Sequence, residues 1–181
     1  VTPSSRRVMR AWKNGQRIYR RMLPWLRPAD EVFEVGAGIG CTVKVFEQGG
    51  YRASGIEPNR GFHAYSCEQL HTDLGNENLY SVPLVPRFDL ILLIHVLEHF
   101  RSPRAAMQHL QGIIKPEGLL YVECPNVGAP FATRNRLFNF AHIHNFTPAT
   151  LQMLAEGTGY QVVKWFTSWD SPNLEVLLRH A

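Results

Sequence analysis

A strand-like segment that runs directly into three glycines at alternate positions constrains the fold of this chain more than any other feature. Residues 32–40 read V-F-E-V-G-A-G-I-G, with glycines at Gly36, Gly38 and Gly40. Because glycine lacks a Cβ atom and adopts backbone angles that other residues avoid, such a turn lets a ligand approach the backbone closely. The helix that follows presents free N–H groups toward the same place. An isolated turn of this kind is equally typical of a plain strand-to-helix connection, but its context favours a nucleotide-like ligand.

From residue 31 onward, short apolar segments alternate with helix-like segments, which is typical of a parallel sheet flanked by helices. The apolar segments predict strands at residues 31–35, 52–57, 79–82, 88–94 and 119–124, and a closing pair at 161–167 and 174–178. The intervening segments predict helices at 41–48 and 62–70, one that begins at Ser102 and Pro103, and one that begins at Thr147 and Pro148.

The N-terminal region carries most of the positive charge. The net charge is only +4, yet eight Lys and Arg residues precede the first acidic residue, Asp30. Apolar residues recur there at helical spacing, which predicts an amphipathic helix that ends near Pro24. We therefore divide the chain into a basic helical region, 1–28, and an α/β domain, 29–181. A helix packed on the domain with a solvated basic face is the favoured interpretation, while an acidic acceptor, a nucleic acid or an anionic membrane surface remain alternatives.

Size and composition exclude several classes. A chain of 181 residues buries one substantial core, and no run of about 18 apolar residues indicates a membrane span. The N-terminus does not resemble a secretory signal. Cys41, Cys67 and Cys124 are scattered, which argues against a disulfide framework and a structural zinc site. We expect a soluble, cytoplasmic protein.

Two carboxylates narrow the choice of ligand. Glu57 ends the next predicted strand, about 20 residues beyond the glycine turn, where a carboxylate can accept hydrogen bonds from ribose hydroxyls. A dinucleotide fingerprint that started at Gly36 would need glycine where this chain has Cys41. Glu34 suits a cationic amino-acid tail and disfavours a nearby pyrophosphate. The pattern favours an adenosyl ligand over a dinucleotide.

With these motifs the chain resembles the class I S-adenosylmethionine-dependent methyltransferases, especially the small single-domain group that includes the quinone-biosynthesis methyltransferases. Further matches are F-D-L-I-L-L-I-H-V-L-E-H at 88–99, I-I-K-P-E-G-L-L-Y-V-E-C-P-N at 113–126, and H-I-H-N-F-T-P-A-T-L-Q-M-L-A-E-G-T-G-Y at 142–160. The resemblance covers nearly the whole chain. It implies a Rossmann-like three-layer α/β sandwich with a mostly parallel seven-stranded sheet and an antiparallel final strand, and S-adenosylmethionine as cofactor.

The resemblance also assigns site residues. Gly36, Gly38 and Gly40 would line the methionine and ribose portions of the cofactor, with Glu34 near its amino group and Glu57 on the ribose hydroxyls. Ile94 and His95 would flank it at the end of the fourth strand. The family usually places an acidic or polar residue after the third strand to contact adenine, but residues 79–87 contain no carboxylate, so this contact is unassigned.

The chemistry of methyl transfer asks little of the protein, because the sulfonium already carries an activated methyl group. A hydroxyl or amine acceptor benefits from a general base, for which histidine suits neutral pH. We rank His142 and His95 first as catalytic candidates, followed by His144. His99 and Glu98 are interpreted as packing or capping residues. No metal is expected, since neither the 95 and 99 pair nor the 142 and 144 pair has a matching carboxylate or cysteine.

The segment 125–145 is expected to shape the acceptor site. Its arginines would bind an anionic group of the substrate or face solvent, and its phenylalanines would stack on a substrate ring or anchor an ordinary loop. These residues are Phe131, Arg134, Arg136, Phe138 and Phe140.

The sequence thus predicts a methyltransferase that acts on an O, N or C atom of a small molecule. The alternatives are an NAD-dependent oxidoreductase, and a non-catalytic module of a larger protein that binds S-adenosylmethionine. A nucleic-acid partner is disfavoured, because little is inserted between the strands to grip a macromolecule; RNA methylation is a subordinate alternative.

Overall fold

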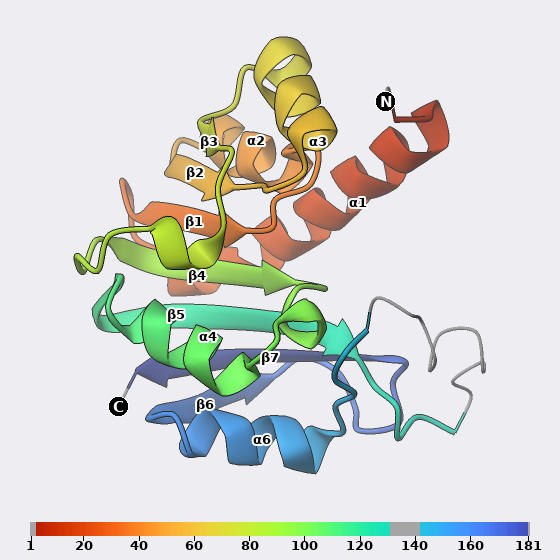
Figure 1. The fold of residues 1–181 in the computed structure, drawn as a ribbon, viewed down its shortest axis with the longest axis vertical. Coiled ribbons are helices and arrows are strands. Elements are labelled where there is room, and N and C mark those ends of the chain that lie inside the picture. Colours follow the sequence, from red (N-terminus) through yellow and green to blue (C-terminus); the bar gives the residue numbers. More distant parts are fainter. Residues whose placement is uncertain (1–2, 131–141, 181) are drawn as a thin grey trace.

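A computed structural model describes residues 3–130 and 142–180 and forms a layered α/β domain (Figure 1). The strands are β1 (Glu31–Val35), β2 (Arg52–Ile56), β3 (Leu74–Gly75), β4 (Phe88–Ile94), β5 (Ile114–Pro125), β6 (Tyr160–Trp165) and β7 (Asn173–His180). The helices are α1 (Ser5–Met22), α2 (Cys41–Gln48), α3 (Arg60–Tyr65), α4 (Pro103–Gln111) and α6 (Pro148–Glu156), with short helical turns η1 (Leu23–Trp25), η2 (Ser66–Leu70), η3 (Leu79–Ser81) and η4 (Leu97–His99).

The strands form one seven-stranded sheet in the order β3-β2-β1-β4-β5-β7-β6. The pairs from β3 through β5 are parallel, whereas β7 runs antiparallel to both β5 and β6. This confirms the predicted mostly parallel sheet with an antiparallel final strand. The order reverses between β1 and β4, which is where sheets of this kind bind ligands at the carboxyl ends of their strands.

Each face of the sheet is covered by its own apolar layer. Side chains alternate along a strand, so β1 directs Phe33 and Val35 to one face and Val32 to the other. The first face packs against α4 and α6, which lie in front of the sheet in Figure 1, and the second packs against α1 and α2. Strands buried on both faces read as continuous apolar runs, which made β4 predictable from the sequence.

The predicted third strand was wrong. Residues 79–82 were expected to form it, but they contribute the 3₁₀ turn η3, while β3 consists of Leu74 and Gly75 beside β2. Asn78 explains the turn, because its side chain accepts a hydrogen bond from the N–H of Tyr80 and caps η3. The turn buries Leu79 in the layer of α4. The segment that follows the third strand therefore begins at Asn76.

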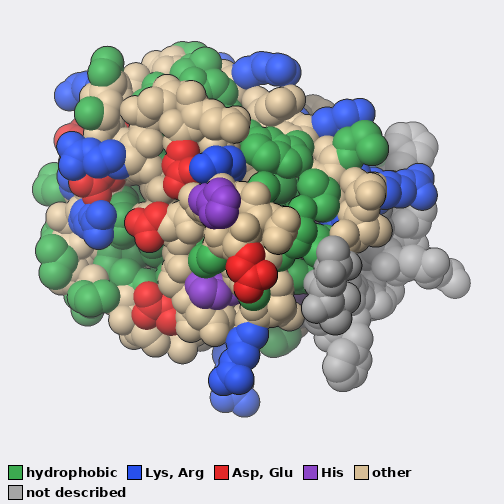
Figure 2. All heavy atoms as spheres, turned by 90° about the horizontal axis from the view of Figure 1, so that it is seen from above, with side chains coloured by type: hydrophobic (Ala, Val, Ile, Leu, Met, Phe, Trp, Pro, Cys, Tyr) green, Lys and Arg blue, Asp and Glu red, His purple; other side chains and the backbone are tan. Residues whose placement is uncertain are grey.

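The N-terminal basic helix α1 is packed on the domain. Gly15 faces α2 so closely that a Cβ atom there would lie 3.0 Å from Thr42 Cα, and Ile18 and Met22 are fully buried. No helix of the described chain is long and apolar enough to cross a membrane. On the face seen in Figure 2, Lys and Arg side chains are interspersed with Asp and Glu side chains.

Some of the arginines of α1 bind carboxylates inside the domain. Arg17 forms an ion pair with Glu123 at 2.6 Å and a second one with Glu175, which also binds Arg21. The Tyr121 hydroxyl donates to Glu175 at 2.7 Å. Glu123 and Glu175 are buried on β5 and β7, so the basic residues that sequence reasoning placed in solvent partly neutralise the sheet instead.

Replacing Arg17 by Met is therefore expected to lower the free energy of unfolding by about 2 kcal/mol, because two buried carboxylates lose a partner that is itself one third exposed. Chemical denaturation measures the change. Lys13→Met, an exposed position on the same helix, is the matched control and should change stability by less than about 0.5 kcal/mol. Equal effects of the two substitutions would contradict the structural role of the ion pairs.

Candidate functional site

The glycine turn between β1 and α2 adopts left-handed backbone angles, with φ of 69° at Gly36, 57° at Gly38 and 77° at Gly40. A Cβ atom on Gly40 would collide with Ser66 Oγ, and one on Gly36 would lie 2.7 Å from a methyl group of Val96. Over Gly38, in contrast, no described atom lies within 4 Å of the Cβ position. The outer glycines thus allow close packing of the protein, while the middle one faces open space.

Glu57 follows β2 and ties this turn to the neighbouring strand. Its Oε2 accepts a hydrogen bond from the N–H of Gly38 at 2.7 Å, and its Oε1 accepts one from the N–H of Asn59 at 2.7 Å. The residue is only 7% exposed. Since each carboxylate oxygen can accept more than one hydrogen bond, Glu57 both shapes the turn and retains capacity to bind hydroxyl groups.

Glu34 is a buried acid at the same end of the sheet. It is 4% exposed, and its Oε2 has no hydrogen-bond partner among the described residues. Burial raises the pKa of its carboxyl group to about 8, against the hydrogen bonds from the Thr42 hydroxyl and the Val43 N–H, and the charge of Glu57 raises it further. A cationic group that bound in the open turn would stabilise the charged form of this buried acid, so the site favours a cationic ligand.

The carboxyl end of β4 lies beside the glycine turn, as the contact between Gly36 and Val96 requires. His95, the first residue after β4, has a φ of 53°, which is strained for a residue with a side chain, and its N–H donates to the carbonyl of Glu123 at 2.8 Å. Such strain is concentrated at functional sites. Ile94 and His95, which the sequence predicts to flank the cofactor, therefore lie at the end of β4 close to the glycine turn.

The imidazole of His95 lies between two buried carboxylates. Its Nε2 is 3.2 Å from Glu123 Oε1, and its Nδ1 is 3.6 Å from Glu98 Oε1. Burial alone would lower its pKa, but the hydrogen bond to Glu123 and the attraction of Glu123 and Glu98 raise the pKa of His95 to about 9. At neutral pH His95 is thus an imidazolium, which donates protons to neighbouring oxygens and is poorly suited to remove one.

A cluster of ionisable side chains lies next to His95 at the end of β4. It consists of Glu98, His99 and His142. Glu98 Oε1 lies 3.9 Å from the Nε2 atoms of both His99 and His142. Glu98 is 1% exposed, and neither of its carboxylate oxygens has a hydrogen-bond partner in the described part of the chain. Burial lowers the pKa of His142, against the attraction of Glu98. The sequence predicted no metal, because no carboxylate was found to match the histidine pairs. The structure places the carboxylate of Glu98 beside His99 and His142.

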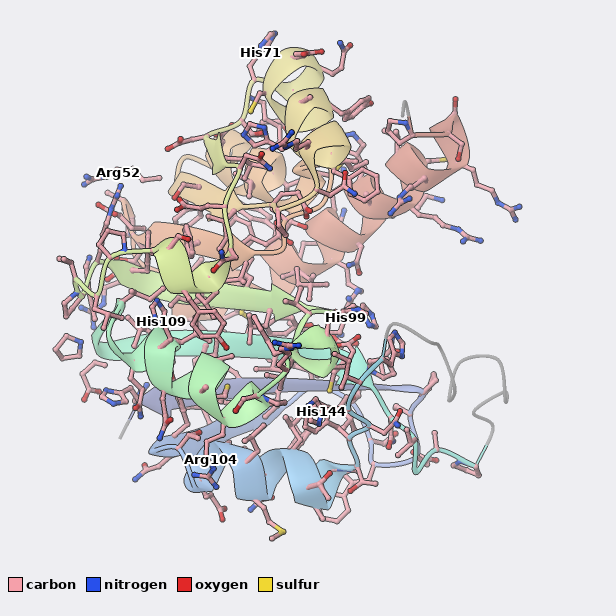
Figure 3. The ribbon with its side chains drawn as sticks, viewed as in Figure 1. Arg52, His71, His99, Arg104, His109 and His144 are labelled. Atoms are coloured by element: carbon pink, nitrogen blue, oxygen red, sulfur yellow. The ribbon has the colours of Figure 1, made fainter. Side chains whose placement is uncertain are left out.

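His144 belongs to the same end of the sheet but points elsewhere. Its backbone N–H donates to the carbonyl of Glu98 at 3.1 Å, whereas its Nε2 lies 3.2 Å from the carbonyl of Arg101. Figure 3 shows His99 and His144 at one end of the sheet, with Arg52 at the opposite end. The backbone contact explains how a segment 40 residues downstream delivers His142 to Glu98.

Four functional candidates escaped sequence reasoning. Glu98 had been interpreted as a capping residue, and Glu123 had received no role, although a charged residue in the apolar run of 119–124 was a usable signal. Asn76 and Glu77 follow the true β3 and offer polar groups where the predicted strand left none. The aromatic and basic residues expected to shape the acceptor site lie outside the described residues, namely Phe131, Arg134, Arg136, Phe138 and Phe140.

Comparison with known proteins agrees with this geometry. Residues 6–164 match the family model described as a methyltransferase domain. The chain is 24% identical over 112 residues to a mitochondrial ubiquinone biosynthesis O-methyltransferase of Dictyostelium discoideum, a match that covers 52% of this chain and 35% of that protein. The chain spans less than half the length of the curated relatives that it matches.

Two solved structures share the fold. An S-adenosylmethionine-dependent methyltransferase from Archaeoglobus fulgidus has a TM-score of 0.76 at 15% identity, over 93% of this chain and 94% of that one. The magnesium protoporphyrin IX methyltransferase of Synechocystis PCC 6803, with bound S-adenosylhomocysteine, has a TM-score of 0.76 at 11% identity, over 94% of this chain and 83% of that one.

Proposed function

We propose that this chain, which belongs to the class I S-adenosylmethionine-dependent methyltransferases, transfers a methyl group to an O, N or C atom of a small molecule. The observation that carries the proposal is the combination of open space over Gly38 with the unpartnered buried oxygen of Glu34. An adenosyl ligand with a cationic amino-acid tail satisfies both features. A dinucleotide could also occupy the space over Gly38, but it would bring phosphate charge toward Glu34 and would leave the carboxyl group without a cationic partner.

The residues at the carboxyl edge of the sheet would hold the cofactor as follows. Gly36, Gly38 and Gly40 would pack along its methionine and ribose portions, Glu34 would bind its amino group, and Glu57 would accept from the ribose hydroxyls. Ile94 and His95 would flank it on the side of β4. We assign the adenine contact, left open by the sequence, to Asn76 or Glu77, because these residues directly follow β3 beside β2.

The cofactor supplies an activated methyl group on a positively charged sulfur. The contribution of this chain is to orient the acceptor in line with that bond and to exclude water. Any acceptor proton would leave through the cluster at the end of β4. Two of the three histidines predicted to be catalytic, His95 and His142, lie beside Glu98 of this cluster. His142 is the better candidate for a general base, because His95 is protonated between Glu98 and Glu123, and His144 is held by the carbonyl of Arg101.

A small acceptor fits this chain better than a macromolecule. The described connections between strands are short, and basic side chains of α1 are used in ion pairs within the domain. The Dictyostelium relative is named for ubiquinone biosynthesis, and the Synechocystis neighbour is named for a small molecule, magnesium protoporphyrin IX. We further infer a reducing compartment such as the cytoplasm, because Cys41, Cys67 and Cys124 are all free thiols.

The test is formation of S-adenosylhomocysteine, measured by mass spectrometry, during incubation with S-adenosylmethionine and a panel of phenols, catechols, carboxylates and amines. We expect turnover with at least one acceptor. Glu57→Gln should weaken cofactor binding by about 10-fold, because the ribose contact loses charge and the Gly38 hydrogen bond is weakened. Cofactor binding without turnover on the full panel would support the alternative of a non-catalytic binding module.

A further inference from the structure

We propose that Glu98, His99 and His142 bind one divalent transition-metal cation at the carboxyl end of β4. Each residue offers one ligand atom, and these three atoms lie within 4.8 Å of one another. Glu98 Oε1 is 3.9 Å from each of the two imidazole Nε2 atoms. At metal–ligand distances of about 2.1 Å, ligands around a tetrahedral ion are separated by about 3.4 Å, so small side-chain movements would complete the site.

The state of Glu98 provides a second, independent observation. Its side chain is 1% exposed, and neither carboxylate oxygen has a hydrogen-bond partner in the described part of the chain. The imidazolium of His95 lies beside this carboxylate, with its Nδ1 3.6 Å from Glu98 Oε1. Burial of a carboxylate without hydrogen bonds is strongly unfavourable unless a cation compensates it. His95 offsets part of this cost, and a metal ion between Glu98 and the two imidazoles would supply the direct contact that the carboxylate oxygens lack.

The fold holds the three ligands from two distant segments. The turn η4 places Glu98 and His99 directly after β4, and the hydrogen bond from the N–H of His144 to the carbonyl of Glu98 fixes the segment that carries His142. The rings of His99 and His142 meet edge to face, with centroids 5.0 Å apart. The ligands are thus positioned by backbone contacts that exist without the ion.

The ligand types indicate which metals would bind. Two imidazole nitrogens and one carboxylate oxygen form a set typical of catalytic zinc sites and of other divalent first-row metals. Magnesium and calcium prefer oxygen ligands throughout. Three protein ligands leave at least one coordination position for a further molecule, as in catalytic rather than structural sites.

The role of the ion, though not its binding, rests on the proposed function. An acceptor hydroxyl that occupies the open position would have a lowered pKa, so that its proton is lost to solvent water. The resulting oxygen anion would form the new O–CH₃ bond as the methyl–sulfur bond breaks, with the electron pair of that bond left on sulfur. The acceptor class that this site favours is therefore a phenol, a catechol or a similar metal-binding oxygen compound.

The experiment is titration of chelator-treated protein with Co²⁺, followed by visible absorption, and with Zn²⁺, followed by calorimetry. We expect one ion per chain with visible absorption bands typical of cobalt bound by nitrogen and oxygen. Glu98→Gln and His142→Gln should each weaken Zn²⁺ binding by at least about 100-fold, because each removes a ligand. His144→Gln, which changes an adjacent histidine outside the ligand set, should leave it unchanged.

Binding of S-adenosylmethionine to the metal-free variants separates this inference from the proposed function. Glu98→Gln should bind the cofactor within about twofold of the unchanged protein, because Glu98 is not assigned to the cofactor. Absence of Co²⁺ absorption and Zn²⁺ heat in the unchanged protein would overturn the metal site. Only a ligand variant that retains a cooperative thermal transition is informative. If such a variant bound Zn²⁺ as tightly as the unchanged protein, the metal site would also be overturned.

Discussion

Gly40→Ala is expected to lower the free energy of unfolding by about 2 to 5 kcal/mol, more than any other single change at the glycine turn. The residue has a φ of 77°, and an added Cβ atom would collide with Ser66 Oγ and lie 3.1 Å from Thr72 Oγ1. Ser66 is fully buried and is itself hydrogen-bonded to Thr72, so neither neighbour can easily move. Urea denaturation measures the loss.

Gly50→Ala is the matched control for this substitution. Gly50 has a φ of 90°, but no described atom lies within 4 Å of its Cβ position. Alanine there should lower stability by only about 1 to 2 kcal/mol, the contribution of the left-handed backbone alone. The difference between the two variants isolates the collision with Ser66. If both variants lost the same stability, the tight packing of the turn on η2 would be contradicted.

Glu34 is expected to make the stability of the ligand-free protein fall as the pH rises. Its folded-state pKa is raised from the ordinary value of 4.5 to about 8 by burial. Between these two values the unfolded chain has released a proton that the folded chain retains, so rising pH favours unfolding. The contribution of Glu34 is fully present below pH 4.5 and is lost by about pH 8, a change of about 5 kcal/mol.

Glu34→Gln tests this pH dependence, since glutamine has the same shape and does not titrate. The difference in unfolding free energy between the variant and the unchanged protein, measured by denaturation from pH 4.5 to pH 9, should shift in favour of the variant as pH rises. Taking the difference cancels the titration of other groups. A difference that stays constant over this range would show that Glu34 is not the buried acid described above.

The sequence predicted best those elements in which several consecutive residues are restricted by the same physical requirement. β4 was predictable because a strand covered on both faces is apolar throughout, and the glycine turn was predictable because its backbone angles restrict the residue type. β3 was not predictable, because two residues carry no periodicity, and its misplacement left Asn76 and Glu77 out of the predicted site.

The cluster at the end of β4 illustrates the limit of reasoning from spacing. The histidine pairs 95 and 99 and 142 and 144 seemed to lack a matching carboxylate, because Glu98 was interpreted as a capping residue and His142 lies more than 40 positions downstream of it. Only the fold, through the contact between His144 and the carbonyl of Glu98, brings these residues together. His95 lies at the end of β4, and its two carboxylate neighbours, Glu98 and Glu123, which raise its pKa, come from different parts of the sequence and were not predicted.

The most direct test of the central claim is calorimetric titration of the purified protein with S-adenosylmethionine, S-adenosylhomocysteine and NADH. We predict saturable binding of both adenosyl compounds at one site per chain, weakened in Glu57→Gln, and no binding of NADH. Binding of NADH without binding of either adenosyl compound would contradict the assignment of the glycine turn and would favour an oxidoreductase instead.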